Sequence, residues 1–282
     1  MSRILSHSSY QERMHRVLTH LESHLDESLS LEELAGLAHF SPYHFHRIFR
    51  GMVGEALGAY MRRLRLERAA GRLRLTRAGI LDIALEAGFE THESFSRAFK
   101  VMFGASPSTY RKVAASMLPQ PITPQGVDIM DVKIVTIPEK RVASVRHIGP
   151  YAECGKAWAA LCAWAGPKGL MTSKGEFLGI CYDDPEVTPP DRIRYDASLV
   201  VPEGIEPDGE VFIQIVGGQD YAQALVQGPY SGIAAAYAAI CGRWAPENNR
   251  EIAHKPSIEV YLNDPETTPE AELRTLIHAP LA

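Results

Sequence analysis

The sequence predicts a multidomain chain: an all-α N-terminal part with two helix-turn-helix units, then an α+β C-terminal part made of a duplicated β-α-β-β unit. Three observations support this fold class: a repeat at offsets of 49 and 50 residues, a second repeat at offsets of 79 and 80, and a proline-rich segment between them. The expected boundaries are residues 8–114, 115–128 and 129–282. Of the 282 residues, 45% are hydrophobic, which is enough to build cores and excludes wholesale disorder.

Charge is distributed unevenly along the chain, whose formal net charge of −5 would by itself argue against a nucleic-acid partner. Residues 1–115 hold 16 Lys and Arg against 12 Asp and Glu, with 8 of the 11 histidines, whereas residues 116–282 hold 13 against 22. The net charge is therefore +4 in the first part and −9 in the second. A basic part joined to an acidic one predicts two functions on one chain.

Simple patterns exclude several classes of protein. The longest apolar run, residues 233–241, is too short to span a bilayer, and the charged N-terminus is unlike a signal peptide. We therefore expect a soluble cytoplasmic protein. The cysteines form no CxxC pair, which argues against a zinc ribbon and favours idle thiols in a reducing compartment. They are Cys154, Cys162, Cys181 and Cys241.

The first helical unit has clear start signals. An amphipathic helix is expected over residues 10–25, because apolar residues recur there every three or four positions. Ser30 and Glu33 form a capping box that opens a short helix. Ser41 and Pro42 then supply the N-cap and first residue of a second helix. The outer face of this second helix carries Tyr43, His46, Arg47 and Arg50.

The same pattern recurs about fifty residues later. Gly88 is expected to end a helix that begins at Ile80, Thr91 to cap the helix that follows, and Ser106-Pro107 to start a short final helix. Nine residues match between the units, including Phe45 with Phe95 and further pairs at an offset of 49 or 50. The outer face of the second unit's cap-started helix carries His92, Glu93, Ser94, Arg97 and Lys100.

A single amphipathic helix over residues 55–74 is expected to join the two units. Twenty residues span roughly 30 Å, and successive major-groove turns on one face of B-DNA lie about 34–36 Å apart. One monomer is therefore expected to reach two adjacent major grooves of an asymmetric site. Seven arginines and one acid, Glu67, lie between residues 62 and 77, which suits phosphate contact. The alternative is a solvated charged face.

The second unit resembles the signature of the AraC/XylS family of transcription regulators over the residues IALEAGFETHESFSRAFKVMFGASPSTYRK. The first fits over LEELAGLAHFSPYHFHRIFRGMVGEAL, although His39 stands where a small turn residue is usual. The resemblance covers residues 8–114 and implies a double-stranded-DNA-binding regulator, more often an activator, with RNA polymerase open as a further partner. It implies base contacts by Tyr43, His46, Arg47, His92, Glu93, Ser94 and Arg97, while Arg50 and Lys100 suit phosphate.

The histidine pairs of the basic part and the proline-rich segment after it indicate no metal site and no catalytic site. His20 and His24 are four apart on one helix, and His44 and His46 flank Phe45, but no cysteine or acid stands at a familiar ligand spacing. We expect no metal and no cofactor. Residues 116–127, SMLPQPITPQGV, contain three prolines and no charge, which is typical of a semi-rigid linker.

The acidic part contains the second duplication. Extended segments are expected over 132–137 and 142–145, and the GPY triplet at 149–151 recurs at 228–230 before a second Ala-rich helix. The segment 184–189 recurs at an offset of 80. Two copies of a β-α-β-β unit, each of about eighty residues, are therefore expected to pair and to leave a cleft on their pseudo-twofold axis.

Glu259 is the candidate ligand-binding carboxylate. In the strand 257–262 it shares a face with Tyr261, and it is matched to Ile180 in the first copy, so the charge breaks the symmetry. A carboxylate among aromatic rings suits a lipophilic cation. The alternative is a solvated strand-edge Glu beside an ordinary aromatic core. The candidate site residues are Glu259, Tyr151, Trp158, Tyr182, Tyr230, Tyr237, Trp244 and Tyr261.

The paired GPY turns and the ending IEVYLNDPETTPEAELRTLIHAPL resemble the GyrI-like effector-binding domain over residues 129–282. The resemblance implies that an inward Glu at the position of Glu259 helps to bind organic, often cationic effectors, as in multidrug sensing. Together the two resemblances predict a ligand-responsive transcription regulator that is not an enzyme. A GyrI-like hydrolase and a drug-sequestering protein, each fused to a DNA-binding domain, stay open as alternatives, although no GxSxG or GxGxxG motif is present.

Overall fold

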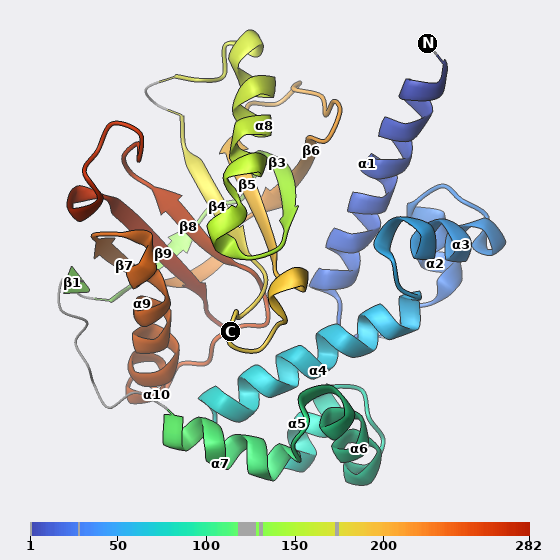
Figure 1. The fold of residues 1–282 in the computed structure, drawn as a ribbon, viewed down its shortest axis with the longest axis vertical. Helices are drawn as coiled ribbons and strands as arrows, with labels where there is room; N and C mark the ends of the chain where they lie inside the picture. The colour runs from blue at the N-terminus through green and yellow to red at the C-terminus, as the bar shows by residue number, and fades with distance from the viewer. Residues whose placement is uncertain (1, 28, 118–127, 130–131, 173–174) are drawn as a thin grey trace. The chain divides into compact units, whose positions relative to one another are not determined.

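A computed structural model describes residues 2–27, 29–117, 128–129, 132–172 and 175–282. The chain divides into two compact units, Met1–Gln120 and Pro121–Ala282. The first is all-helical and the second is α+β (Figure 1), which confirms the predicted fold class. Most of the predicted linker, residues 118–127, lies outside the described residues.

Seven helices make up the described part of the first unit. The predicted caps are present, since the Ser30 capping box is complete and the Ser41 and Thr91 hydroxyls accept hydrogen bonds from the backbone three residues on. The joining helix begins at Leu57 instead of Glu55, because Gly54 ends the preceding helix with φ of 86°. The helices are α1 (Ser2–Ser23), α2 (Leu31–Leu37), α3 (Pro42–Val53), α4 (Leu57–Leu75), α5 (Ile80–Glu86), α6 (His92–Phe103) and α7 (Pro107–Met117).

The sequence repeat reappears as a repeat of aromatic packing. Phe45 and Phe49 pack with ring centroids 5.9 Å apart, and Phe95 and Phe99 with centroids 5.5 Å apart. In each unit the second phenylalanine meets a tyrosine edge-on, Phe49 with Tyr60 and Phe99 with Tyr110. The four phenylalanines are fully buried. Each helix-turn-helix unit is therefore held by the same small aromatic core.

The backbone conformation at His39 explains why a small turn residue is usual at this position. His39 has a positive φ of 53°, and its counterpart Gly88 has φ of 75°. The turn between the two helices of each unit therefore requires a left-handed residue, which glycine adopts without strain. Histidine is tolerated in the first unit at a cost of about 1 kcal/mol.

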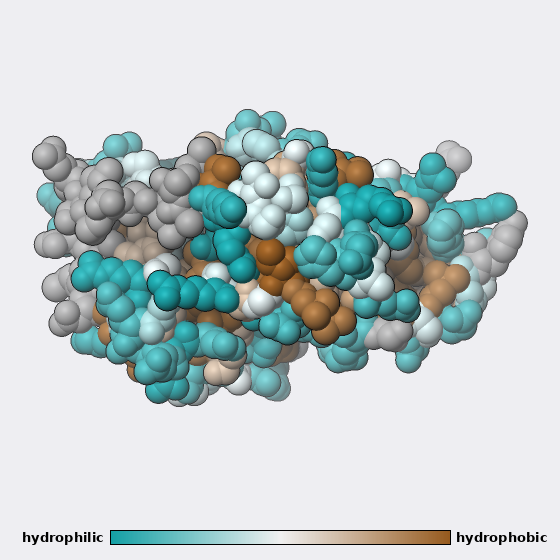
Figure 2. Space-filling view, turned by 90° about the horizontal axis from the view of Figure 1, so that it is seen from below, coloured by the Kyte–Doolittle hydropathy of each residue, from teal (hydrophilic) through white to brown (hydrophobic). Residues whose placement is uncertain are grey.

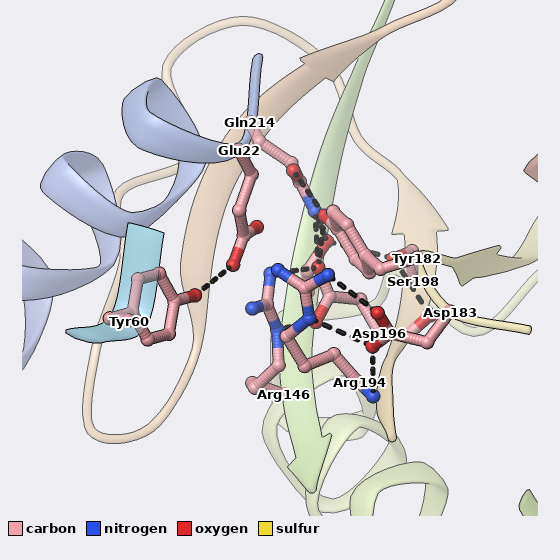
Figure 3. Close-up of polar contacts among 10 residues, drawn as sticks. Glu22, Tyr60, Arg146, Tyr182, Asp183, Arg194, Asp196, Ser198 and Gln214 are labelled. Carbon is pink, nitrogen blue, oxygen red and sulfur yellow. Dashed lines mark hydrogen bonds and ion pairs between the residues drawn. The ribbon is translucent and has the colours of Figure 1, made fainter. Parts of the chain in front are cut away.

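Polar contacts between helices also fix the first unit. Tyr60 of α4 donates a hydrogen bond of 2.8 Å to the carboxylate of Glu22 on α1 (Figure 3). Both side chains are buried. A buried carboxylate needs such a donor, so this contact sets how α1 lies against α4.

The second unit is an antiparallel sheet of nine strands in its described residues, and eight of them follow the order β1-β7-β9-β8-β4-β5-β3-β6. Its two repeats are β3-α8-β4-β5 and β7-α9-β8-β9, as predicted. The elements are β1 (Asp128–Ile129), β2 (Lys133–Ile137), β3 (Lys140–Ile148), α8 (Gly155–Ala165), β4 (Phe177–Cys181), β5 (Arg194–Val200), β6 (Phe212–Val216), β7 (Gln219–Gln227), α9 (Ile233–Ala239), the π-helix η5 (Ile240–Trp244), α10 (Ala245–Glu247), β8 (Ser257–Tyr261) and β9 (Arg274–Pro280).

Each repeat has an additional strand that pairs with the other repeat. β2 precedes β3 but pairs with β7, and β6 precedes β7 but pairs with β3. β6 was not predicted from the sequence. This exchange of edge strands joins the two halves into one sheet.

The predicted GPY turns are structurally equivalent. Gly149 and Gly228 both have positive φ, 145° and 121°. The amide of each donates a 2.9 Å hydrogen bond, to the carbonyl of Ile193 and of Leu273 respectively. The turns thus bring the start of each helix to the same place in its half.

Helices α8 and α9 cover the same face of the sheet, as Figure 1 shows. α8 packs on β3 and β5, while α9 packs on β7 and β9. The central strands β4 and β8 therefore lie between the areas covered by the two helices. The opposite face carries a separate apolar cluster that includes Leu178, Ile180 and Ile258.

The coloured surface in Figure 2 is mostly hydrophilic, with apolar atoms in smaller patches. Across the residues that the structure describes, no helix is both long and apolar enough to cross a membrane. In the same residues no group of three or more His, Cys, Asp and Glu side chains is arranged to hold a metal ion.

Candidate functional site

The candidate DNA-reading residues lie on the outer faces of α3 and α6. Phe45, Phe49, Phe95 and Phe99 turn into the core, which leaves the intervening positions outside. The side chain of Tyr43 lies outside the described residues, although its backbone belongs to α3. The candidates with described side chains are all exposed: His46, Arg47, Arg50, His92, Glu93, Ser94, Arg97 and Lys100.

Ser94 has a structural role that the sequence analysis did not include. Its backbone amide donates to the Thr91 hydroxyl at 3.1 Å, and its own hydroxyl donates to the Thr91 carbonyl at 2.9 Å. Ser94 therefore helps to cap α6. Its hydroxyl proton is already engaged, so a base contact would leave it only as an acceptor or require the hydroxyl to rotate.

The arginines of α4 are mostly engaged within the first unit. Arg63 bonds Glu55 and Glu67, and Arg65 donates to the backbone carbonyls of residues 25 and 27. Arg68 pairs with Asp26 and Arg72 with Glu86, so α4 is tied to the end of α1 and to α5. These four side chains are already engaged within the unit, which argues against the expectation that the cluster as a whole suits phosphate. Arg62 and Arg77 are exposed.

The second candidate site centres on Glu259, which lies on β8 directly opposite Gly179 of β4. Its side chain is buried, with an exposed fraction of 6%. Tyr261 donates a hydrogen bond of 2.7 Å to Oε2, and the Cys181 thiol donates one of 3.3 Å to Oε1. The alternative of a solvated strand-edge Glu is therefore wrong.

A chain of hydrogen bonds extends from this carboxylate across the sheet. The hydroxyls of Tyr261 and Tyr195 are 2.9 Å apart, and Trp158 Nε1 donates to the Tyr195 hydroxyl at 3.1 Å. Tyr261 has one proton, which goes to Glu259, so Tyr195 must donate to Tyr261. Every proton in the chain points toward the carboxylate, an arrangement that stabilises its charged form.

Aromatic rings surround this chain. Tyr261 meets Trp158 and Tyr230 edge-on, each with a centroid separation of 5.6 Å. Tyr151 packs edge-on against Tyr195 at 5.9 Å and donates its hydroxyl to the Asp183 carbonyl at 2.6 Å. Tyr230 is 40% exposed and is the ring at this site most accessible from solvent.

Tyr237 of α9 adds a buried hydroxyl near the carboxylate. It is close enough to lower the pKa of Glu259, in the direction opposite to the effect of burial. Its oxygen is buried and makes no hydrogen bond of good geometry with any residue that the structure describes. Such a group is costly to bury and is available to an incoming ligand.

Tyr182 does not belong to this group, which corrects the sequence prediction. It follows β4 at a position that points to the opposite face of the sheet from Gly179 and Cys181. There its hydroxyl donates to Asp196 at 2.7 Å, and the guanidinium of Arg146 lies 4.4 Å from its ring centroid (Figure 3). Asp196 is fully buried, so Tyr182 serves to satisfy a buried ion pair.

Trp244 also takes no part in the contacts described for Glu259. It belongs to η5, two helical turns beyond Tyr237, and packs against the apolar cluster that includes Ala236 and Ile240. Within the described residues no hydrogen bond or ring contact connects it with Glu259. The structure thus gathers five of the seven predicted aromatics, namely Tyr151, Trp158, Tyr230, Tyr237 and Tyr261.

Burial controls the proton chemistry of the site. It raises the pKa of Glu259, and the hydrogen bonds from Tyr261 and Cys181, together with the nearby Tyr237 hydroxyl, oppose that rise. Burial first, and then the charge of Glu259, raise the pKa of Tyr261 and Cys181 well above their usual values. These phenol and thiol groups therefore act as neutral donors, and Glu259 supplies the only negative charge among them.

Sequence reasoning missed Tyr195, Cys181 and Gly179. It also matched Glu259 to Ile180, whereas β4 and β8 correspond at an offset of 80, so its counterpart is Gly179. The offset of 80 between the segment 184–189 and its repeat gave the correct register. A one-residue shift exchanges the faces of a strand, so the wrong offset hid the glycine opposite the carboxylate.

Comparison with known families gives two matches. Residues 130–282, more than half of the chain, match the model of a GyrI-like small molecule binding domain. Residues 34–113 match the model of a helix-turn-helix domain.

Related proteins cover one part of the chain or the other. The Right origin-binding protein of Escherichia coli (strain K12) is 46% identical over 96 residues, 34% of this chain and 33% of that protein, so the chain spans about a third of its length. The HTH-type transcriptional activator AarP of Providencia stuartii is 38% identical over 106 residues, 37% of this chain and 78% of that protein. The crystal structure of the EcmrR C-terminal domain matches with 18% identity and a TM-score of 0.45, over 54% of this chain and 97% of that one.

Proposed function

The chain belongs to the GyrI-like family of small-molecule-binding domains, with an AraC-type helix-turn-helix domain ahead of it, and from this we propose that the whole protein is a ligand-responsive regulator of transcription. We assign DNA binding to residues 8–114, a linker to 115–128 and effector binding to 129–282. A regulator of this kind acts in the cytoplasm, more often as an activator, and RNA polymerase is its natural further partner.

The effector is a small lipophilic organic cation. The observation that carries this proposal is the buried carboxylate of Glu259, enclosed by rings and by neutral hydroxyl and thiol donors. A monocation placed there would neutralise the charge, and the rings offer cation–π surface. A neutral ligand would leave the buried charge without a counter-ion.

The DNA site is asymmetric and spans two adjacent major grooves. α4 contains 19 residues, a length of about 28 Å, and separates the two recognition helices. Base contacts are assigned to exposed residues early in each helix, and phosphate contacts to those one turn later. The base-reading set is Tyr43, His46, Arg47, His92, Glu93, Ser94 and Arg97, and the phosphate set is Arg50 and Lys100.

The ligand acts by favouring one arrangement of the protein over another. Regulation requires the cation to bind the DNA-competent form with a different affinity from the other form. Thermodynamic linkage then requires DNA to change the affinity for the cation by the same factor. This reciprocity separates regulation from simple coexistence of two binding domains.

The test uses the full chain, methyltriphenylphosphonium as the probe cation and triphenylphosphine oxide as a neutral analogue of similar size. A DNA site is first selected from a random pool, and its affinity is measured by fluorescence anisotropy with and without each probe. We expect the cation to change the DNA affinity, and the DNA to change the cation affinity, by equal factors. The neutral analogue should bind weakly and leave DNA affinity unchanged.

Two other results would favour the alternatives. DNA affinity that is the same at every saturation of the cation would indicate a sequestering protein. Consumption of an ester probe, lost in Glu259→Gln, would indicate a hydrolase, in which the carboxylate activates water.

A further inference from the structure

Gly179 is the only position without a side chain among the described residues of β4 and β8. It lies in a central strand, fully paired on both sides, directly opposite Glu259. Glycine in a strand interior has an entropic cost relative to alanine, and it often marks a place where other groups approach the backbone closely.

The groups that approach Gly179 are the two tyrosine hydroxyls of the hydrogen-bond chain. A Cβ at this position would lie 2.6 Å from the hydroxyl oxygens of both Tyr195 and Tyr261, and 2.7 Å from a ring carbon of Tyr195. Rotating a hydroxyl would not relieve these contacts, because the ring itself is in the way. Any larger residue would therefore push the two rings off the strand.

The chain of donors crosses the sheet at this gap. Tyr195 comes from β5 and Tyr261 from β8, on either side of β4. Their hydroxyls meet 2.9 Å apart above Gly179, and Tyr261 continues to Glu259 at 2.7 Å. With a side chain between them, the two tyrosines could not form this contact.

We infer that Gly179 is a positioning residue of the effector site, whose missing side chain lets Tyr195 and Tyr261 hold the Glu259 carboxylate charged and oriented for a monocation. The two repeats thus contribute different features to one site from equivalent positions. β8 supplies the carboxylate, and β4 supplies the space for the donors that stabilise it. The part of this inference that concerns the cation rests on the proposed function.

The first test needs no ligand. In the full chain labelled with 13C at glutamate side chains, the carboxyl signal of Glu259 is assigned with Glu259→Gln and titrated in wild type and in Gly179→Ala. Loss of the Tyr261 donor should raise the pKa of Glu259 in the variant, because that hydrogen bond stabilises the charged form. The same titration curve in both proteins would overturn the inference.

The second test measures binding of methyltriphenylphosphonium. Gly179→Ala should weaken it about tenfold, the value expected for losing one hydrogen bond to a charged group. Tyr261→Phe should weaken it to a similar extent, and the double variant should be little worse than either single one, because both changes remove the same hydrogen bond. Fully additive losses would overturn the inference.

Gly166→Ala is the matched control. Gly166 lies in the same domain, at the end of α8, in an ordinary helical conformation and with nothing within 4 Å of an added Cβ. It should bind and titrate like wild type. If Gly179→Ala does not fold, Tyr195→Phe removes the second donor without adding an atom, and it should move the Glu259 titration in the same direction.

The outcomes separate the two proposals. If wild type does not bind the cation but the carboxyl titration shifts as expected, the cationic effector is wrong and the positioning role of Gly179 holds. If wild type binds the cation and the titration of Gly179→Ala is unchanged, the positioning role is wrong and the effector proposal holds.

Discussion

The hydroxyl of Tyr261 donates a 2.7 Å hydrogen bond to Oε2 of Glu259, two residues earlier on the same face of β8. This contact joins a buried carboxylate to a phenol whose own pKa is raised by burial and by that carboxylate. The site therefore keeps a negative charge out of water with neutral donors alone, and a cation would complete it.

Glu259→Gln should weaken methyltriphenylphosphonium binding at least tenfold while leaving DNA affinity intact, because it removes the only charge opposite the cation. Calorimetry or fluorescence titration of the full chain gives the affinity. Triphenylphosphine oxide is the control ligand and should be little affected. Equal losses for the two probes would mean that shape, and not charge, determines binding.

The pH dependence of the Glu259 site follows from the raised pKa. The folded protein retains a proton at Glu259 above pH 4.5, where an unfolded glutamate has released it. The unfolding free energy of ligand-free protein should therefore fall as pH rises from about 4.5 through the folded-state pKa, while cation affinity rises over the same interval.

Glu259→Gln provides the comparison for this pH dependence. It should remove both trends and stabilise ligand-free protein near neutral pH, by about 1 kcal/mol. All three tryptophans lie in the second unit, so tryptophan fluorescence during denaturation reports on this domain. A variant with the same pH profile as wild type would show that another group titrates.

Arg47→Ala and Arg97→Ala should each cost about 1–3 kcal/mol of affinity for the selected DNA site and relax the base preference at one position. Both residues are exposed at equivalent places on α3 and α6. Selection from a random pool, repeated with each variant, measures the preference. Losses that are uniform over all sequences would assign the residue to phosphate contact.

Neighbouring arginines on α4 should differ in how much their replacement by alanine destabilises the helical unit. Arg63 bonds Glu55 and Glu67, and its side chain is only 13% exposed, so Arg63→Ala should destabilise the helical unit by about 2 kcal/mol. Arg62 is exposed, and Arg62→Ala should leave stability unchanged within about 0.5 kcal/mol. Hydrogen exchange of the α4 amides measures both effects. Equal stability in the two variants would contradict the structural role of Arg63.

The helical unit was predictable from sequence because its signals are local. Caps at Ser30, Ser41 and Thr91 fix where helices begin, and repeated phenylalanines at a spacing of four fix which side is buried. The role of the α4 arginines was not predictable in the same way. Arg68 pairs with Asp26, 42 residues away, and composition cannot show such a partner.

In the sheet unit the duplication was predictable, but parts of the site were not. Tyr182 was assigned to the site by residue type, whereas the alternation of a strand places it on the other face. Tyr195 was not predicted as a site residue, because β5 is buried along nearly its whole length and shows no alternating pattern. Gly179 carries no chemistry of its own, so only the register of β4 against β8 reveals it.

His278 should make the second unit sensitive to acid. Its Nε2 lies 2.8 Å from the Gln223 amide nitrogen, and its Nδ1 lies 3.2 Å from the Ile258 carbonyl. With Nδ1 donating to the carbonyl and Nε2 accepting from the amide, the ring is neutral. Burial lowers its pKa from 6.5 to about 4.

Protonation would place a donor on Nε2 opposite another donor, so the folded state resists it. The contribution to stability is fully present above pH 6.5 and is lost as pH falls toward 4, a change of about 3 kcal/mol. His278→Asn should lower stability at neutral pH and flatten this decline. The control variant His254→Asn, at an exposed position, should leave the decline unchanged. Denaturation followed by tryptophan fluorescence at several pH values measures the slope, and an equal slope in His278→Asn and wild type would assign the acid sensitivity to other groups.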